Sequence, residues 1–154
     1  MPVAAIDLTD IAAGTGGFVI YGEDANDQSG RSIASAGDVN GDGYDDLIIG
    51  ALLGDASGDA KADAGDSYVV FGTASGFGAT LELADVAAGT GGFVIHGEDA
   101  GDRSGFAVAS AGDLNGDGFD DLVIGAPRGD AAGDAKASAG DVYVLFGKAS
   151  GFSA

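Results

Sequence analysis

The strongest constraint on the fold is an internal repeat that fills most of the chain. Residues 14–77 recur as residues 89–152, and 48 of the 64 aligned positions are identical. Several of the differences exchange one apolar or aromatic side chain for another of similar volume, such as Ile33 for Val108. Exchanges of that kind are tolerated within one fold, so both copies are expected to build the same structural unit.

Each copy is expected to form four short β-strands. The apolar runs span residues 18–22, 31–37, 45–51 and 66–72 in the first copy and 93–97, 106–112, 120–126 and 141–147 in the second. They are rich in Val, Ile, Phe and Tyr and are bounded by Gly, Asp and Ser, which is typical of strands between turns. Four strands per repeat favour an all-β fold made of β-propeller blades. Residues 83–92 have room for one helical turn, which glycine would end.

The composition argues against several classes of protein. The chain carries 25 acidic residues against six basic ones, a formal net charge of −19, which disfavours binding to nucleic acids and to anionic membranes. It has no Cys and a single His. Without a nucleophile and base pair, we expect no enzyme activity. No apolar run is long enough to span a membrane, and the first residues lack the pattern of a signal peptide.

An Asp-rich motif, D-x-N-x-D-G-x-x-D, spans residues 38–46 and again residues 113–121. Ca²⁺ binds six to eight hard oxygen atoms, which the side chains at positions 1, 3 and 5 of a tight loop can supply together. Gly at position 6 allows the sharp turn, position 7 offers a backbone carbonyl, and Asp at position 9 closes the shell. The predicted ligands are Asp38, Asn40, Asp42, Tyr44 and Asp46 in the first copy and Asp113, Asn115, Asp117, Phe119 and Asp121 in the second. We predict two Ca²⁺ ions per chain rather than Mg²⁺, which demands strict octahedral geometry.

EF-hands begin in the same way, but they need a Glu at position 12 of the loop. That position is Ile49 in the first copy and Ile124 in the second, and both lie in strand-like runs. The ion is therefore expected in a β-hairpin loop. A plain hairpin turn is the alternative, since Asn-Gly and Asp-Gly are strong turn signals. A turn alone does not require acids at positions 1, 5 and 9.

The residues around this loop read S-G-x-[SA]-[IV]-A-S-A-G-D-x-N-G-D-G-x-D-D-L-[IV]-I-G-A in both copies. This pattern resembles the FG-GAP repeat of the integrin α-chain N-terminal β-propeller and its bacterial relatives. The resemblance covers essentially the whole chain. Ser29-Gly30 and Ser104-Gly105 stand where the family has Phe-Gly, and Gly50-Ala51-Leu52 departs from the Gly-Ala-Pro that is intact at residues 125–127. The resemblance implies a blade with Ca²⁺ in the hairpin between its first and second strands. In integrins, seven such blades form a ring with an adhesive function.

Weaker signals concern charged residues outside the motif. Further cations have candidate ligands in Asp55, Asp59, Asp63 and Asp66 and in Asp130, Asp134 and Asp141, but acidic runs of this kind are usually solvated surface. His96 replaces Tyr21 of the other copy, which indicates an amphipathic strand position. Arg128-Gly129-Asp130 spells a tripeptide that many integrins recognise, but Leu53-Gly54-Asp55 fills the same place in the first copy, so chance is the better account.

The sequence favours a calcium-binding β-propeller module with a structural or binding role. The extracellular space or the cell surface is the expected location, because such loops suit the high Ca²⁺ concentration found there. Residues 1–79 would form one blade unit with a leading outer strand, and residues 80–154 the second. Three alternatives stay open: an adhesive or lectin-like module that binds a protein or glycan ligand, an accessory propeller of a secreted hydrolase, and an engineered repeat pair.

The strand order also predicts self-assembly. The run at residues 93–97 is expected to be the fourth strand of the first blade. That leaves the run at residues 18–22 without a partner in its own chain and the second blade one strand short. Propellers have about four to eight blades, so two cannot close a ring, and an open strand edge invites pairing with another copy. We expect a cyclic homo-oligomer, with a trimer favoured over a tetramer.

Overall fold

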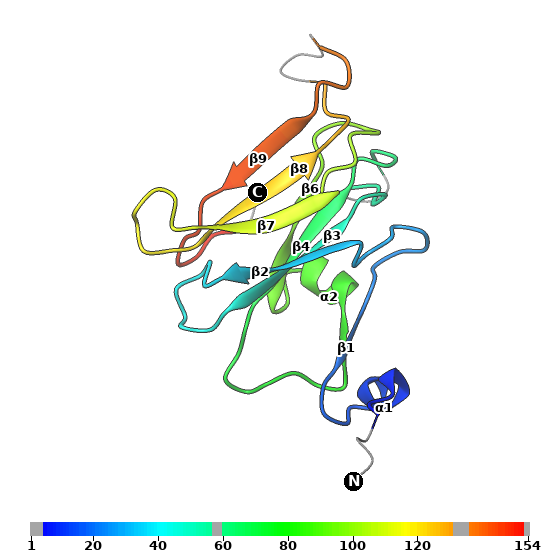
Figure 1. Ribbon diagram of the computed structural model, residues 1–154, viewed down its shortest axis with the longest axis vertical. Coiled ribbons are helices and arrows are strands. Elements are labelled where there is room, and N and C mark those ends of the chain that lie inside the picture. Colours follow the sequence, from blue (N-terminus) through cyan, green and yellow to red (C-terminus); the bar gives the residue numbers. More distant parts are fainter. Residues whose placement is uncertain (1–4, 57–59, 131–135, 153–154) are drawn as a thin grey trace.

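The computed structural model describes residues 5–56, 60–130 and 136–152, and these are mainly β-strand (Figure 1). The strands are β1 (Val19–Tyr21), β2 (Ser32–Gly37), β3 (Asp46–Ala51), β4 (Asp66–Val70), β5 (Thr80–Glu82), β6 (Gly92–His96), β7 (Ala107–Gly112), β8 (Asp121–Ala126) and β9 (Asp141–Leu145). Two five-residue helices accompany them, α1 (Leu8–Ala12) and α2 (Leu83–Ala87). Each of the eight apolar runs coincides with one strand, so the mainly β fold predicted from the sequence is confirmed.

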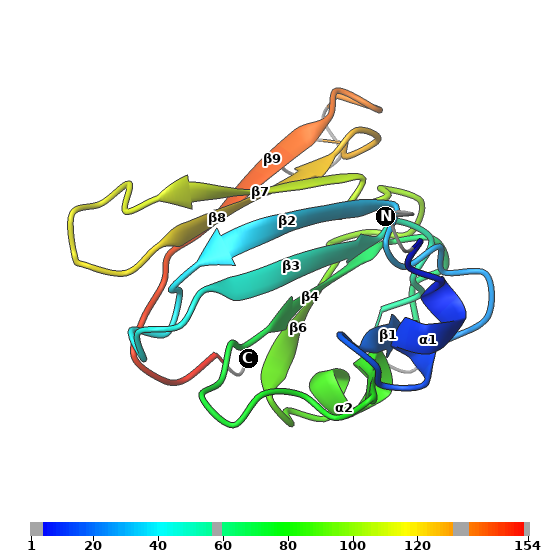
Figure 2. The same ribbon diagram turned by 60° about the horizontal axis from the view of Figure 1, so that its bottom comes forward.

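Two antiparallel sheets follow the two repeats (Figure 2). Blade 1 is the four-stranded sheet β2-β3-β4-β6, and blade 2 is the three-stranded sheet β7-β8-β9. β6 comes from the second repeat, as the strand order predicts, and it pairs with β4 so that His96 lies opposite Asp66. β2 and β7 lie side by side, and the N–H of Val108 donates to Ser32 Oγ at 3.0 Å. The two blades of a single chain do not close a ring.

β1 is not unpaired within the chain, contrary to the prediction for residues 18–22. It pairs in parallel with β5, with Val19 opposite Thr80. The run Thr-Leu-Glu of β5 has only one apolar side chain, too weak a pattern to predict a strand. The helical turn predicted within residues 83–92 is confirmed as α2, and α1 occupies the same place in the first repeat. Neither helix in the described ranges has the length and apolar character needed to cross a membrane.

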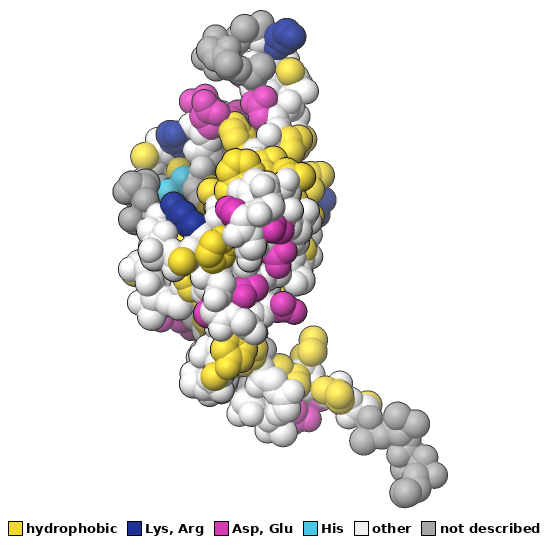
Figure 3. Space-filling view, turned by 90° about the vertical axis from the view of Figure 1, so that its left-hand side faces the viewer, with side chains coloured by type: hydrophobic (Ala, Val, Ile, Leu, Met, Phe, Trp, Pro, Cys, Tyr) yellow, Lys and Arg dark blue, Asp and Glu magenta, His cyan; other side chains and the backbone are white. Residues whose placement is uncertain are grey.

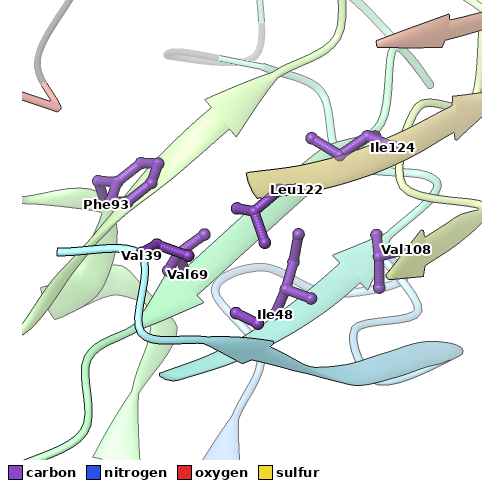
Figure 4. Packing of buried hydrophobic residues seen from close by; sticks show 8 residues of the cluster. Val39, Ile48, Val69, Phe93, Val108, Leu122 and Ile124 are labelled. Carbon is purple, nitrogen blue, oxygen red and sulfur yellow. The ribbon is translucent and has the colours of Figure 1, made fainter. Parts of the chain in front are cut away.

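The larger hydrophobic core lies between the two blades (Figure 4). Its buried members are Ala36, Val39, Ile48, Val69 and Phe93 on the side of blade 1 and Val108, Leu122 and Ile124 in blade 2. The two sheets also approach closely at a glycine of β3. A Cβ atom added to Gly50 would collide with the carbonyl group of Gly105 in the other blade, which explains why this position of β3 has no side chain.

A second core covers the opposite face of blade 1. α2 packs Leu83 and Val86 onto a cluster that includes Tyr68 and Val70. Leu83 and Val86 are both fully buried, because residues three apart lie on the same face of a helix. Blade 1 is therefore enclosed by α2 on one side and by blade 2 on the other.

Candidate metal centre

The two Asp-rich loops join the first and second strands of their blades. Loop 1 (residues 38–46) follows β2, loop 2 (residues 113–121) follows β7, and both lie on the left-hand side of the molecule in Figure 1. At position 6, Gly43 has a φ of 89° and Gly118 a φ of 94°. Only glycine enters this left-handed region at little cost. The predicted hairpin loops therefore form in both copies.

Asp38 is the hub of loop 1. Its Oδ1 atom accepts hydrogen bonds from the N–H groups of Gly41, at 2.7 Å, and Asp42, at 3.0 Å. Its Oδ2 atom accepts a third from the N–H group of Gly43 at 2.9 Å. Successive backbone amides that point into a turn form a concave site for an anion. These amides hold the carboxylate of Asp38 inside the loop.

Asn40 and Asp42 belong to the same hydrogen-bonded turn. Asn40 Oδ1 accepts from the N–H of Asp42 at 2.9 Å, and Asn40 Nδ2 donates to Asp42 Oδ2 at 3.1 Å. Asp42 Oδ1 accepts from the N–H of Tyr44 at 2.9 Å. The structure thus brings the predicted ligands at positions 1, 3 and 5 into one tight loop.

Asp46, at position 9, lies beneath the loop and is 3% exposed. Its Oδ2 atom accepts from the N–H of Val39 at 3.0 Å, and its Oδ1 atom from the N–H of Gly72 at 2.8 Å. Burial raises the pKa of the Asp46 carboxyl group, these two hydrogen bonds lower it, and the nearby charges of Asp42 and Asp38 raise it again. Sequence reasoning assigned Asp46 only as a ligand. It missed that the same carboxylate anchors the loop to the chain that follows β4.

Loop 2 repeats this arrangement bond for bond. Each hydrogen bond of loop 1 described above has its counterpart between the equivalent residues of loop 2. Asp113 Oδ1, for example, accepts from the N–H of Gly116 at 2.7 Å, the same distance as its counterpart in loop 1. The predicted ligands that take part are Asp113, Asn115, Asp117, Phe119 and Asp121. Asp121 is fully buried, like its counterpart in loop 1.

The oxygen atoms of the two loops suit a hard cation, although the described side chains are not already arranged around one. Nowhere among them do three or more Asp, Glu or His side chains converge closely enough to hold an ion. A carboxylate oxygen that accepts one N–H still has a second lone pair. Asp38 Oδ1 accepts two N–H groups, but Asp38 Oδ2, Asn40 Oδ1 and Asp42 Oδ1 each accept one. The oxygens with one donor keep a lone pair for an ion, and Ca²⁺ tolerates irregular shells of oxygen atoms. Residues and loop geometry fit Ca²⁺, and the ligand assignment stays a prediction.

Position 8 distinguishes the two loops. Asp120 Oδ2 accepts from the N–H of Asp38 at 2.8 Å, and the N–H of Asp120 donates to the carbonyl of Asp38 at 3.2 Å. Loop 2 is therefore tied directly to loop 1. Asp45, at position 8 of loop 1, is exposed. Sequence reasoning missed this contact because both loops have Asp at this position.

A polar cavity of about 350 Å³ lies at the outer side of blade 1, lined in part by Asp27, Asp55, Asp66 and His96. His96 Nδ1 lies 2.8 Å from Asp66 Oδ1. Burial raises the pKa of the Asp66 carboxyl group, and the contact with His96 lowers it. The described acidic residues here form no metal cluster. Asp59 and Asp134, two further candidates of the acidic loops, lie outside the described residues.

Comparison with known proteins shows that both Asp-rich loops lie in segments that match a protein family. The FG-GAP repeat model matches residues 29–70 and 104–145, more than half of the chain, and both loops lie within these segments. Integrin alpha pat-2 of Caenorhabditis elegans is 38% identical over 133 residues, which are 79% of this chain and 9% of that protein. Integrin alpha-V of Gallus gallus is 37% identical over 127 residues, 81% of this chain and 10% of that protein. The chain spans about a tenth of the length of these relatives.

Proposed function

The chain belongs to the FG-GAP repeat family, and we propose that it is a Ca²⁺-binding β-propeller module with a structural or ligand-binding role outside the cell. The observation that carries this proposal is the identical folding of both Asp-rich loops. The sequence of loop 1 supplies three carboxylates, those of Asp38, Asp42 and Asp46, and the charges of Asp38 and Asp42 lie near enough to raise the pKa of the Asp46 carboxyl group. Like charges at short range disfavour the ionised forms, and one divalent cation would neutralise most of their charge.

The ion would act as a structural element. Loop 1 already connects three parts of the molecule: its own hairpin, the chain after β4 through Gly72, and loop 2 through Asp120. An ion held by Asp38, Asn40, Asp42, Tyr44 and Asp46 would stiffen this junction, and the corresponding ion in loop 2 would do the same for blade 2. Extracellular modules bind Ca²⁺ with dissociation constants of about 0.1–1 mM, which supports a location outside the cell.

The proposal predicts that Ca²⁺ raises the thermal stability of the chain. Because the loops bind the ion only when they are folded, each site adds about 2.7 kcal/mol at a free Ca²⁺ concentration of about 100 times the Kd. Melting curves in Ca²⁺, in Mg²⁺ and in chelator measure the effect, and Mg²⁺ should stabilise much less. Asp42→Ala or Asp117→Ala should each remove about half of the gain, and the double variant all of it.

Asp45→Ala is the matched control for these variants. It removes one negative charge from the same loop, at an exposed position outside the predicted ligand set. Calorimetric titration should count two ions for the unchanged chain and for Asp45→Ala, and one for Asp42→Ala. A melting temperature that does not respond to chelator would contradict the proposal.

The similarity to integrin alpha chains favours a second, compatible role. In that role the module binds a protein or glycan ligand and contributes to adhesion. Binding of the Ca²⁺-loaded chain to immobilised extracellular proteins and to a glycan array tests it. The double variant Asp42→Ala and Asp117→Ala shows whether binding depends on the ion. Absence of binding in both assays would favour the purely structural role.

A further inference from the structure

Blade 2 ends in an open strand edge. In blade 1, β4 pairs with β3 on one side and β6 on the other, whereas β9, its counterpart, pairs only with β8 among the described strands. The exposure of matched side chains differs accordingly. Val69 of β4 is fully buried, while Val144 at the same place in β9 is 45% exposed and Val142 is 70% exposed. Hydrophobic side chains gather on the upper part of the side shown in Figure 3, at the level of blade 2.

β1 pairs only with β5 among the described strands, so its other edge is open as well. The N–H of Val19 donates to the carbonyl of Ala79 at 3.1 Å, on the side where β5 lies. The backbone groups of successive residues in a strand point to opposite sides. Val19 and Tyr21 therefore face β5, and Phe18 and Ile20 face away from it.

The counterparts of Phe18 and Ile20 in the second repeat show which strand this edge fits. They are Phe93 and Ile95 of β6. The N–H of Gly97 donates to the carbonyl of Gly65 at 2.8 Å at the end of the β4–β6 ladder, so the odd-numbered residues of β6 face β4. The free edge of β1 thus corresponds to the edge of β6 that pairs with β4.

A cavity of about 240 Å³ beside β9 matches the segment that precedes β1. Ile124, Tyr143 and Leu145 are among the residues that line it. The three residues at the same places in blade 1 belong to the cluster in which α2 buries Leu83 completely. Leu8, the counterpart of Leu83 in α1, is 79% exposed. The cavity beside β9 is therefore the equivalent of the site that holds Leu83 in blade 1, and α1 carries the equivalent leucine, Leu8.

We propose that residues 6–22 of one copy complete blade 2 of a second copy. β1 adds antiparallel to β9 in the register that β6 has on β4, which places Tyr21 opposite Asp141, Val19 opposite Tyr143 and Gly17 opposite Leu145. β5 stays on the other edge of β1, and α1 seats Leu8 in the cavity beside β9. The partner is a second copy because β1 and β9 lie at opposite ends of one molecule in Figures 1 and 2.

The faces of the blades agree with this pairing. Val39 of blade 1 is 1% exposed, while its counterpart Leu114 in blade 2 is 62% exposed. Conversely, Val108 of blade 2 is 9% exposed, and its counterpart Ile33 in blade 1 is 61% exposed. Each chain thus offers two complementary faces, and a head-to-tail interface of this kind gives a closed ring when the rotation between copies closes and an open filament when it does not. With two blades per chain, three copies give a six-bladed ring, within the usual range of about four to eight blades.

Gly125→Ala tests the assembly without disturbing the fold. A Cβ atom on Gly50, its counterpart, would collide with the carbonyl group of Gly105 in the other blade. The proposal places Gly125 in the same contact with Gly30 of a second copy. Within its own chain, a Cβ atom on Gly125 meets only Ala107, at 3.7 Å or more.

Light scattering of the full chain in Ca²⁺ measures the mass of the assembly. The unchanged chain should have the mass of three copies of 14.8 kDa, and Gly125→Ala the mass of one, with the same circular dichroism spectrum. Gly78→Ala is the matched control, because its Cβ atom would meet only the carbonyl of Thr80 at 3.7 Å, and it should leave the trimer intact. A ring of four would support the strand addition and refute the count. A monomeric chain, or an oligomer that survives Gly125→Ala, would overturn the proposal.

A disulfide cross-link tests the register. Tyr21 and Asp141 take the places of His96 and Asp66, whose side chains approach to 2.8 Å. Residues paired in this way without mutual backbone hydrogen bonds have Cα atoms about 4.5 Å apart, within reach of a disulfide. The described chain has no Cys, so a mixture of Tyr21→Cys and Asp141→Cys chains should give a covalent heterodimer. Tyr21→Cys mixed with Val142→Cys is the control, because Val142 points to the other face, and equal yields would refute the register.

Discussion

Blade 1 and blade 2 are built from nearly the same residues but bury them very differently. Val69 and Tyr68 of blade 1 are completely buried, whereas Val144 of blade 2 is exposed and Tyr143 is only half-buried. The two valines have the same intrinsic preferences, so the difference comes from what covers them. Blade 1 has a fourth strand, a helix and a neighbouring blade. A repeat that cannot bury its own faces depends on its neighbours for stability.

The Asp-rich loops show the opposite behaviour. The N–H of Asp38 in loop 1 donates to Asp120 of loop 2, whereas the equivalent N–H of Asp113 in loop 2 has no such side-chain acceptor among the described residues. Nevertheless the two loops form the same internal hydrogen bonds between equivalent residues, at nearly the same distances. Loop geometry is therefore encoded locally by the motif, whereas the burial of the strands is encoded by the neighbours.

The largest difference in stability is expected between equivalent substitutions in the two helices. Leu83→Ala removes a fully buried side chain from α2 and should lower the free energy of unfolding by about 2–5 kcal/mol. Leu8→Ala makes the same change in α1, where the side chain is exposed, and should cost less than about 0.5 kcal/mol. Urea unfolding, with both substitutions made in a Gly125→Ala chain to keep it monomeric, measures the difference. Equal costs would show that the two helices are packed alike.

This contrast also explains what could be predicted from the sequence. The strands and hairpin loops follow from short-range patterns: apolar runs between turn residues, and glycine at the left-handed positions of the loops. The fourth strand of blade 1 follows from strand order. The parallel pairing of β1 with β5 could not be predicted, because Thr80–Glu82 has a single apolar side chain. The different roles of Asp45 and Asp120 are equally invisible, because they depend on which blade has a neighbour.

A smaller difference in stability is expected between the Asp45→Ala and Asp120→Ala variants. Asp120→Ala leaves the N–H of Asp38 without its acceptor, and hydrogen bonds to charged groups contribute about 1.5–3 kcal/mol. Asp45→Ala removes the same side chain from an exposed position and should change the free energy of unfolding by less than about 0.5 kcal/mol. Denaturant unfolding at the same ionic strength, with both substitutions made in a Gly125→Ala chain to keep it monomeric, gives the comparison. A cost for Asp45→Ala as large as that for Asp120→Ala would mean that loop 1 has a second neighbour within its own chain.

The smallest difference in stability is expected at the one position where the sequences of the outer strands differ. His96 of β6 contacts the buried Asp66, while Tyr21 fills the same place in β1. Burial raises the pKa of the Asp66 carboxyl group above its ordinary value, and the contact with His96 partly offsets that rise. Without His96, the pKa of this group should be higher still.

His96→Phe should therefore destabilise the chain in a pH-dependent way. A carboxyl group whose pKa is higher in the folded chain favours folding when protonated. Its contribution is complete below the unfolded pKa of about 3.9 and is lost as the pH rises through the folded pKa. The variant and the unchanged chain should be equally stable near pH 4 and differ by up to about 1 kcal/mol at pH 7. Melting curves across this range, with Tyr21→Phe as the matched control, measure the difference, and a cost independent of pH would show that His96 acts through packing alone.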